Sequence, residues 1–185
     1  MIPVTGSAKV KSRARKPRLP SVAAPLLVLG VGNALLTDDA AGLVMLEELA
    51  RDTGNDNAVE YLDGGTQGLA LMGRLSGRKA VVLLDAVSLG STPGTLHVLR
   101  FPFVHPMPRA TTAHEGSGAE LLRFAALVDE LPEQAWIIGI EAGCVRTGIG
   151  LSGPVTAAIP RAVTAVRGLI SNLKQEYCDV PGDPR

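Results

Sequence analysis

The chain has 185 residues, which suits one domain with a complete hydrophobic core. Hydrophobic residues make up 46% of the chain and aromatic residues only 3%, so the base-stacking surfaces that bind single-stranded nucleic acids are not expected. The net charge is zero, but six basic residues and no acidic residue precede position 38. The rest carries 12 basic and 18 acidic residues, a net charge of −6, which argues against a nucleic-acid-binding surface.

The N-terminal residues 1–24 are rich in Pro, Ser, Lys and Arg and lack an apolar period, which predicts a disordered basic arm. A solvated tail or an upstream start codon accounts for such an arm, and a contact with an acidic partner is the alternative. The stretch 23–36 superficially resembles a signal peptide, but Pro25, Gly30 and Gly32 interrupt it and no suitable cleavage site follows. No apolar run reaches the roughly 18 residues that a membrane span needs.

Strand and helix patterns alternate through residues 25–176, which predict one domain followed by a flexible tail at 177–185. The continuous apolar run 80–84 indicates a central strand covered on both faces. The alternating stretch 95–101 predicts an edge strand that runs antiparallel to its neighbours, and three prolines in 102–113 predict an irregular loop. The other strands are expected at 26–31, 59–62 and 136–140, and the helices at 39–52, 67–76, 115–131 and from Ser152 onward.

This order of elements predicts the fold class α/β, as a three-layer α/β/α sandwich. Its twisted sheet is expected to hold about five strands, mostly parallel, with one antiparallel strand. The stretch 26–42, LLVLGVGNALLTDDAAG, joins the first strand to the first helix through a glycine loop and two carboxylates. Such a junction lies at the carboxyl end of a parallel sheet, where ligands bind. A dinucleotide-binding fingerprint is not met, because Leu35 takes the place of its third glycine.

Three side chains are expected on this side of the sheet: Asp39, Asp85 and His114. Two carboxylates and an imidazole suit a first-row divalent metal with positions left open for substrate. Simpler roles stay open, because Asp39 can cap a helix, Asp85 can accept hydrogen bonds from backbone amides and His114 can be an ordinary loop residue. His97 and His105 show no associated carboxylates and are predicted to be structural or exposed.

Other nucleophiles and redox motifs are missing from the sequence. Cys144 and Cys178 form no CxxC pair and no disulfide framework, so a reduced, cytoplasmic setting is the simpler interpretation. Neither cysteine stands beside a histidine, and no serine lies in a G-x-S-x-G elbow. The run Asp63, Gly64, Gly65 and Thr66 is expected as a strand-end loop that shapes a pocket or simply turns the chain.

Five segments between about Leu26 and Leu173 resemble the [NiFe]-hydrogenase maturation endopeptidases, in order and with similar spacing. They are LGVGNALLTDDAAG, LDGGTQG, LLDAVSLGSTPGTLHVLR, AHEGSGAELL and GCVRTGIGLSGPVTAAIPRAV. The resemblance implies the same α/β/α fold and an aspartic-type endopeptidase. Such an enzyme removes a C-terminal extension from the large-subunit precursor of a [NiFe] hydrogenase after nickel insertion.

The resemblance also implies that Asp39, Asp85 and His114 contact the nickel, which the precursor supplies and the protease does not keep. The catalytic residues are to be sought among the same three side chains, because either a nickel-polarised water or a carboxylate base can assist cleavage. Relatives can carry Glu at the position of Asp39. The Asp side chain is one methylene shorter than that of Glu, so the metal is expected nearer the backbone or slightly shifted. Asp38 is expected to start the helix or to support a ligand, and residues 63–66 to bind substrate.

Two other functions stay open from the sequence. A non-enzymatic metal-binding or nucleotide-binding module needs only the glycine loop, and a related α/β peptidase would act on a different protein precursor. The protease interpretation further expects a cytoplasmic monomer.

Overall fold

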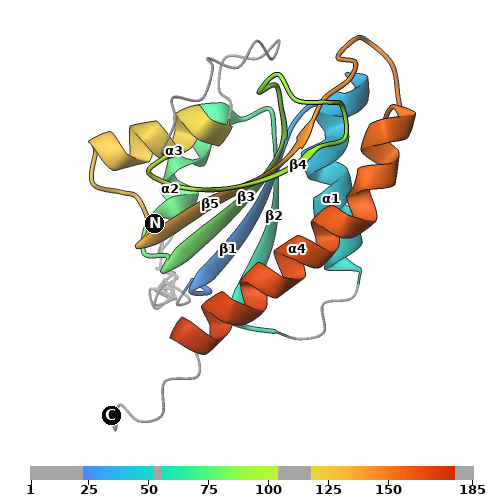
Figure 1. The fold of residues 1–185 in the computed structure, drawn as a ribbon. Helices are drawn as coiled ribbons and strands as arrows, with labels where there is room; N and C mark the ends of the chain where they lie inside the picture. The colour runs from blue at the N-terminus through green and yellow to red at the C-terminus, as the bar shows by residue number, and fades with distance from the viewer. Residues whose placement is uncertain (1–22, 52–55, 104–117, 178–185) are drawn as a thin grey trace, which may run out of the picture.

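The computed structural model describes residues 23–51, 56–103 and 118–177. Its five strands form one sheet in the order β2-β1-β3-β5-β4, in which β4 alone is antiparallel to its neighbour (Figure 1). The mostly parallel, five-stranded sheet is therefore confirmed. The strands are β1 (Leu26–Val31), β2 (Val59–Gly65), β3 (Ala80–Val87), β4 (Leu96–Arg100) and β5 (Gln134–Glu141).

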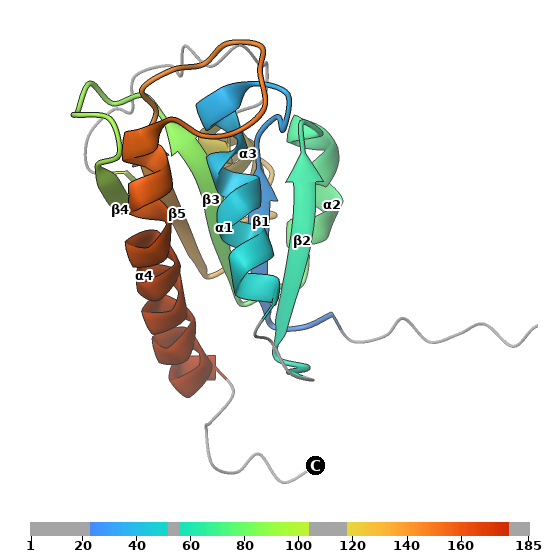
Figure 2. The same cartoon turned by 90° about the vertical axis from the view of Figure 1, so that its right-hand side faces the viewer.

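Helices cover both faces of the sheet, as the three-layer prediction requires. The helices α1 and α4 lie on one face, and α2 and α3 lie on the other (Figures 1 and 2). Two short 3-10 helices precede α1 and α2. The helical segments are η1 (Thr37–Ala40), α1 (Ala41–Ala50), η2 (Gly68–Leu71), α2 (Met72–Leu75), α3 (Gly118–Leu127) and α4 (Gly153–Tyr177).

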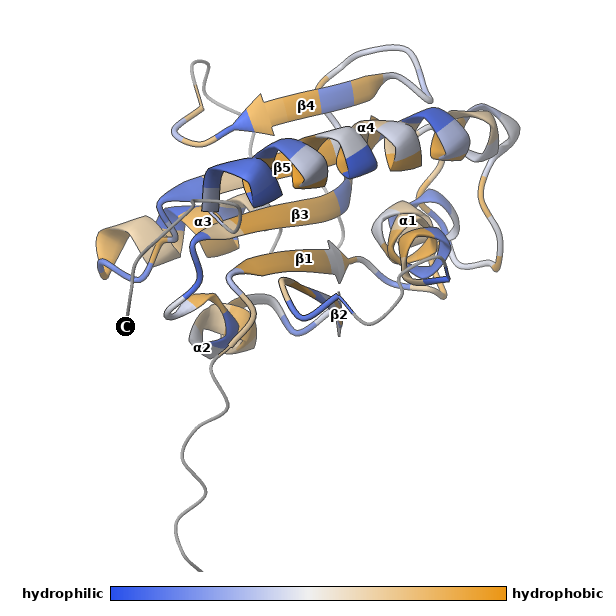
Figure 3. Ribbon diagram, turned by 90° about the horizontal axis from the view of Figure 1, so that it is seen from below, coloured by the Kyte–Doolittle hydropathy of each residue, from blue (hydrophilic) through white to orange (hydrophobic). Residues whose placement is uncertain are grey.

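Strand β3 occupies the centre of the sheet, and every one of its residues is buried. Successive side chains of a strand point to opposite faces. Val82 and Leu84 accordingly pack in the core below α1 and α4, whereas Val81 and Leu83 pack in the core below α2 and α3. Apolar residues fill both layers, and the hydrophilic residues of α4 lie on its outer side (Figure 3). The continuous apolar run 80–84 thus has the predicted physical cause.

Several boundaries differ from the prediction. The predicted helix 39–52 begins two residues earlier, as the 3-10 helix η1, and becomes α-helical at Ala41. Strand β2 extends to Gly65, so three residues of the expected strand-end loop 63–66 belong to the strand. The predicted helix 115–131 ends at Leu127, because Asp129 adopts a positive φ of 56° that an α-helix does not accommodate. Of the predicted arm 1–24, residues 1–22 lie outside the described residues, as do residues 178–185 of the predicted tail 177–185, His105, His114 and Cys178; Tyr177, predicted to be in the tail, is the last residue of α4.

The chain changes direction across the sheet between β1 and β3. From β1 it passes first to β2 on one side and then to β3 on the other. Pairing between β1 and β3 ends at Gly30 and Leu84, whereas pairing between β3 and β5 continues to Val87 and Glu141. The carboxyl ends of β1 and β3 therefore diverge, at the point of the strand order where open α/β sheets bind ligands.

Two glycines allow the segment after β1 to fold back tightly. Gly32 has a φ of 136°, and a Cβ there would collide with the backbone of Asp39. Gly42 lies in the first turn of α1, where a Cβ would overlap the carbonyl oxygens of Val31 and Leu84. Helix α1 can approach β1 and β3 this closely only because position 42 lacks a side chain.

We expect Gly42→Ala to lower the free energy of unfolding by about 1–3 kcal/mol, because the added methyl group must displace backbone atoms. Gly168→Ala is the matched control, since Gly168 is also helical but a Cβ there would meet no other atom within 4 Å. That change should raise stability by up to about 1 kcal/mol. Urea unfolding of both variants measures the difference, and equal stability of the two variants would contradict the packing described for α1.

Candidate active site

Asp39 lies in η1, directly after the glycine loop that follows β1. Its side chain is only 2% exposed, and its Oδ2 accepts a hydrogen bond of 2.7 Å from the backbone N–H of Asn33. No side-chain hydrogen bond caps η1 or α1, so the helix-capping role considered for Asp39 is wrong. The loop instead folds back onto this carboxylate and holds it at the end of β1.

Asp85 lies near the end of β3, one residue beyond the last pairing of β3 with β1. By the alternation of the strand, its side chain is on the same face as Val81 and Leu83, toward α3. Its Oδ2 accepts a hydrogen bond of 3.3 Å from the N–H of Gly118, the first residue of α3. The backbone-bonding role considered for Asp85 is therefore confirmed by this bond to the start of α3.

The side chain of Asp85 is 8% exposed, and burial raises its pKa. Hydrogen bonds from Gly118 and Ala86 lower the pKa, while the negative charge of Asp39 raises it further, and the resulting pKa is about 7. The two predicted carboxylates are therefore close enough to repel each other. A carboxyl group with a pKa near 7 can both take up and release a proton at neutral pH.

His114, the third predicted residue, is outside the described part of the chain. It precedes Gly118, the residue whose N–H contacts Asp85, by four positions in the sequence. Among the residues that the structure does describe, no group of three His, Cys, Asp or Glu side chains could hold a metal ion. The structure therefore brings together Asp39 and Asp85, and His114 stays a prediction.

Asp38 has a different role from its neighbour. Its side chain is completely buried, and it binds the loop between β5 and α4. Oδ2 accepts hydrogen bonds from the N–H groups of Gly143 (2.9 Å) and Cys144 (2.8 Å) and from the hydroxyl of Ser152 (2.9 Å), and Oδ1 accepts one from the N–H of Ser152 (2.6 Å). Burial raises the pKa of Asp38, but these hydrogen bonds outweigh it and bring the pKa below its ordinary value.

A buried carboxylate that sequence reasoning missed ends the neighbouring strand. Glu141 is the last residue of β5, and it accepts hydrogen bonds of 2.9 Å from the N–H groups of Leu89 and Gly90. Its Oε2 lies 3.0 Å from Nε2 of His97, so the expectation that His97 lacks a carboxylate partner is wrong. The sequence feature that could have identified Glu141 is an acidic residue directly after an apolar run, which is the same pattern that identified Asp85.

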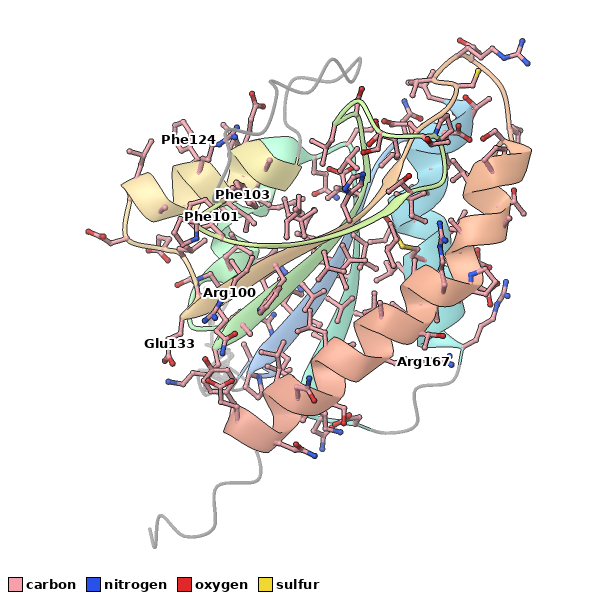
Figure 4. The ribbon with its side chains drawn as sticks, viewed as in Figure 1. Arg100, Phe101, Phe103, Phe124, Glu133 and Arg167 are labelled. Carbon is pink, nitrogen blue, oxygen red and sulfur yellow. The ribbon has the colours of Figure 1, made fainter. Side chains whose placement is uncertain are left out.

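Residues 63–66 lie at the carboxyl end of β2. Asp63 is exposed, and its Oδ1 accepts a hydrogen bond of 2.9 Å from the N–H of Gly65 two residues later. Gly65 has a positive φ of 48°, which fits the local turn that follows. Substrate binding by this run is not tested by these contacts. A hollow of about 580 Å³ lies elsewhere, between α1 and α4, and Arg167 is one of its lining residues (Figure 4). Neither Asp39 nor Asp85 lines it.

Comparison with known proteins decides between the functions left open above. The family model of HycI, described as hydrogenase maturation protease, matches residues 44–168. The chain belongs to the hydrogenase maturation protease family. It is 35% identical over 143 residues to the hydrogenase 2 maturation protease of Escherichia coli, which covers 76% of this chain and 87% of that protein. It is 34% identical over 159 residues to the hydrogenase expression/formation protein HupD of Rhizobium leguminosarum, over 82% and 77% of the two chains.

Solved structures of this protease family share the fold. The hydrogenase maturating endopeptidase HybD of E. coli superposes with a TM-score of 0.67 at 33% identity, over 80% of this chain and 92% of that one. The [NiFe] hydrogenase maturation protease HybD of Thermococcus kodakarensis gives a TM-score of 0.60 at 28% identity, over 78% and 97% of the two chains. The protein is thus a hydrolase and a protease of hydrogenase maturation, and the non-enzymatic module is not favoured. No helix in the described ranges is long and apolar enough to cross a membrane.

We predict that Asp85→Asn makes the free protein more stable at pH 8 than the unmodified protein. The pKa of Asp85 is raised in the folded state above its unfolded value of 3.8, so ionisation opposes folding. The stability cost is absent below about pH 4, accumulates as the pH rises to about 7, and stays constant above. The rise of the pKa from 3.8 to about 7 lowers the free energy of unfolding by at most about 4 kcal/mol.

Chemical denaturation of both proteins from pH 4 to pH 8 measures this difference. Asn keeps an oxygen that can accept the hydrogen bond from Gly118 and carries no charge at any pH. The gap between variant and unmodified protein should therefore widen with pH. A difference in unfolding free energy between the two proteins that is the same at pH 4 and pH 8 would contradict the raised pKa of Asp85.

Proposed function

We propose that this protease removes a C-terminal extension from the large-subunit precursor of a [NiFe] hydrogenase once nickel has been inserted. The observation that carries the proposal is the pair of buried carboxylates, Asp39 and Asp85, at the divergence of β1 and β3 in a chain of this family. A proteolytic site there would meet the precursor at the open end of the sheet.

The donor set suits nickel that arrives with the precursor. Carboxylate oxygens and an imidazole nitrogen are accepted ligands of first-row divalent metals. Asp39 and Asp85 supply the oxygens, and His114 is proposed to supply the nitrogen. Three protein ligands leave positions open, and in our proposal groups of the precursor fill them. A precursor without nickel would then bind poorly, so the protease would cut only after metal insertion.

Two routes to peptide cleavage are compatible with this arrangement. The nickel can act as a Lewis acid that polarises a water molecule or the scissile carbonyl group. A carboxylate of the protease can instead act as general base for the attacking water. In both routes Asp39 and Asp85 lie beside the reacting groups, at the carboxyl ends of β1 and β3. Residues 63–66, at the end of the neighbouring strand β2, are proposed to border the bound peptide.

The proposal further places the protease in the cytoplasm as a monomer, as the sequence suggests. Its cysteines form no disulfide framework, and nothing in the sequence requires a second copy.

We expect Asp39→Asn, Asp85→Asn and His114→Ala each to abolish processing of the nickel-loaded precursor, with far-ultraviolet circular dichroism unchanged. Each change removes a proposed ligand, and reductions of at least about 100-fold in the rate are expected. Glu133→Gln is the control, because Glu133 pairs with Lys79 just before the start of β5, at the opposite end of the sheet (Figure 4). Cleavage is followed by mass spectrometry of the precursor.

Processing at the normal rate by any of the three site variants would remove that residue from the site. If the unmodified protease leaves every hydrogenase precursor of its own cell intact, the assigned substrate is wrong and the alternative peptidase assignment replaces it.

A further inference from the structure

We propose that an apolar patch beside Asp39 docks the folded body of the precursor, outside the segment that is cut. The patch consists of Leu35, Val145 and Ile149, and we call it the rim patch. This inference rests on the proposed function. The partner chemistry that it assigns is an apolar protein surface with an acidic group at its border, which would pair with the exposed Arg146.

The rim patch exposes large apolar side chains to solvent. Ile149 is 89% exposed, Leu35 63% and Val145 40%. They come from two loops that are more than a hundred residues apart in the sequence, 32–36 before η1 and 142–152 between β5 and α4. Single exposed apolar residues are ordinary, but a group of them on adjoining loops is typical of an interaction surface.

Hydrogen bonds hold the two loops together. The N–H of Thr37 donates to the carbonyl of Gly148 (2.9 Å), and the N–H of Gly148 donates to the carbonyl of Leu35 (2.9 Å). Leu36 and Gly148 thereby form a parallel β-bridge. Leu35 directly precedes this bridge on one segment and Ile149 directly follows it on the other, so the bridge fixes the backbone that carries both side chains.

Side chains reinforce the same junction. The hydroxyl of Thr37 donates to the carbonyl of Cys144 (2.6 Å) and accepts a hydrogen bond from the N–H of Arg146 (3.1 Å). The buried carboxylate of Asp38 binds both ends of the loop, at Gly143 and at Ser152. A loop fixed at so many points loses little conformational entropy when a partner binds, so the exposed side chains are pre-organised for contact.

The position of the rim patch indicates its partner. Leu35 precedes Asp39 by four residues, and the loop 142–152 arches over the segment that carries Asp39 (Figure 2). The patch therefore continues the surface around the candidate active site. A protein that brings a metal to Asp39 and Asp85 must face this surface, whereas a free peptide or a free metal ion would not need to cover it.

The test compares Leu35→Gln and Ile149→Gln with Leu127→Gln. Leu127 is the matched control because its side chain is 78% exposed but lies at the end of α3, on the opposite side of the sheet from α4 and far from the rim patch (Figure 1). Isothermal titration with the nickel-loaded large-subunit precursor gives Kd, and mass spectrometry gives KM and kcat for cleavage. Analytical ultracentrifugation of each protein alone gives its oligomeric state.

We expect each rim variant to raise Kd and KM roughly tenfold with kcat unchanged, and the control to match the unmodified protein. Unchanged Kd in both rim variants overturns the inference, while cleavage by the unmodified protein still upholds the proposed function. A dimer of the unmodified protein that the rim variants abolish, with precursor affinity unchanged, also overturns it, because the patch then binds a second copy. If the unmodified protein binds the precursor without cleaving it, and the rim variants lose this binding, the docking surface is upheld and the proposed function is overturned.

Discussion

The divergence of β1 and β3 places two buried carboxylates at one end of the sheet, and the rest of the site depends on this constraint. Pairing between the two strands stops at Gly30 and Leu84, so the next residue of β3, Asp85, has no β1 backbone beside it. The loop after β1 returns through Gly32 and brings Asp39 to the same place. Their mutual repulsion and burial hold the pKa of Asp85 near 7, which is a cost that the free protein bears.

Neighbouring carboxylates of this sheet show how the fold distinguishes structural from reactive groups. Asp38 accepts four hydrogen bonds and ties the loop 142–152 to η1, and Glu141 also binds backbone amides and ties the loop after β3 to the end of β5. Asp85 accepts hydrogen bonds from the N–H groups of Gly118, at 3.3 Å, and of Ala86, but burial and the charge of Asp39 outweigh them and raise its pKa. A carboxylate whose lone pairs are filled by the protein is available for no ligand, whereas one that is poorly satisfied gains from a cation. Asp38 is therefore a structural group, whereas the raised pKa of Asp85 shows that its negative charge is poorly stabilised in the free protein.

Much of this arrangement could be predicted because it depends on local pattern and on strand order. Apolar runs placed the strands, the alternation at 95–101 identified the antiparallel edge strand, and carboxylates at strand ends identified Asp39 and Asp85. The roles of Asp38 and His97 could not be predicted from the sequence. Their hydrogen-bond partners are 44–114 residues away in the sequence, and only the folded structure brings them together. His114 was proposed from its place at the end of a loop and from the family motif, and it stays a prediction because its segment lies outside the described residues.

In our proposal, a metal carried by the precursor completes the site formed by Asp39 and Asp85. The most direct measurement mixes the purified protease with the large-subunit precursor from the same cell, prepared with and without nickel, and follows both by mass spectrometry. We predict a single cut near the C-terminus of the nickel-loaded precursor and none in the nickel-free form. Equal cleavage of the two forms would contradict the proposal, because the two carboxylates would then act without the metal.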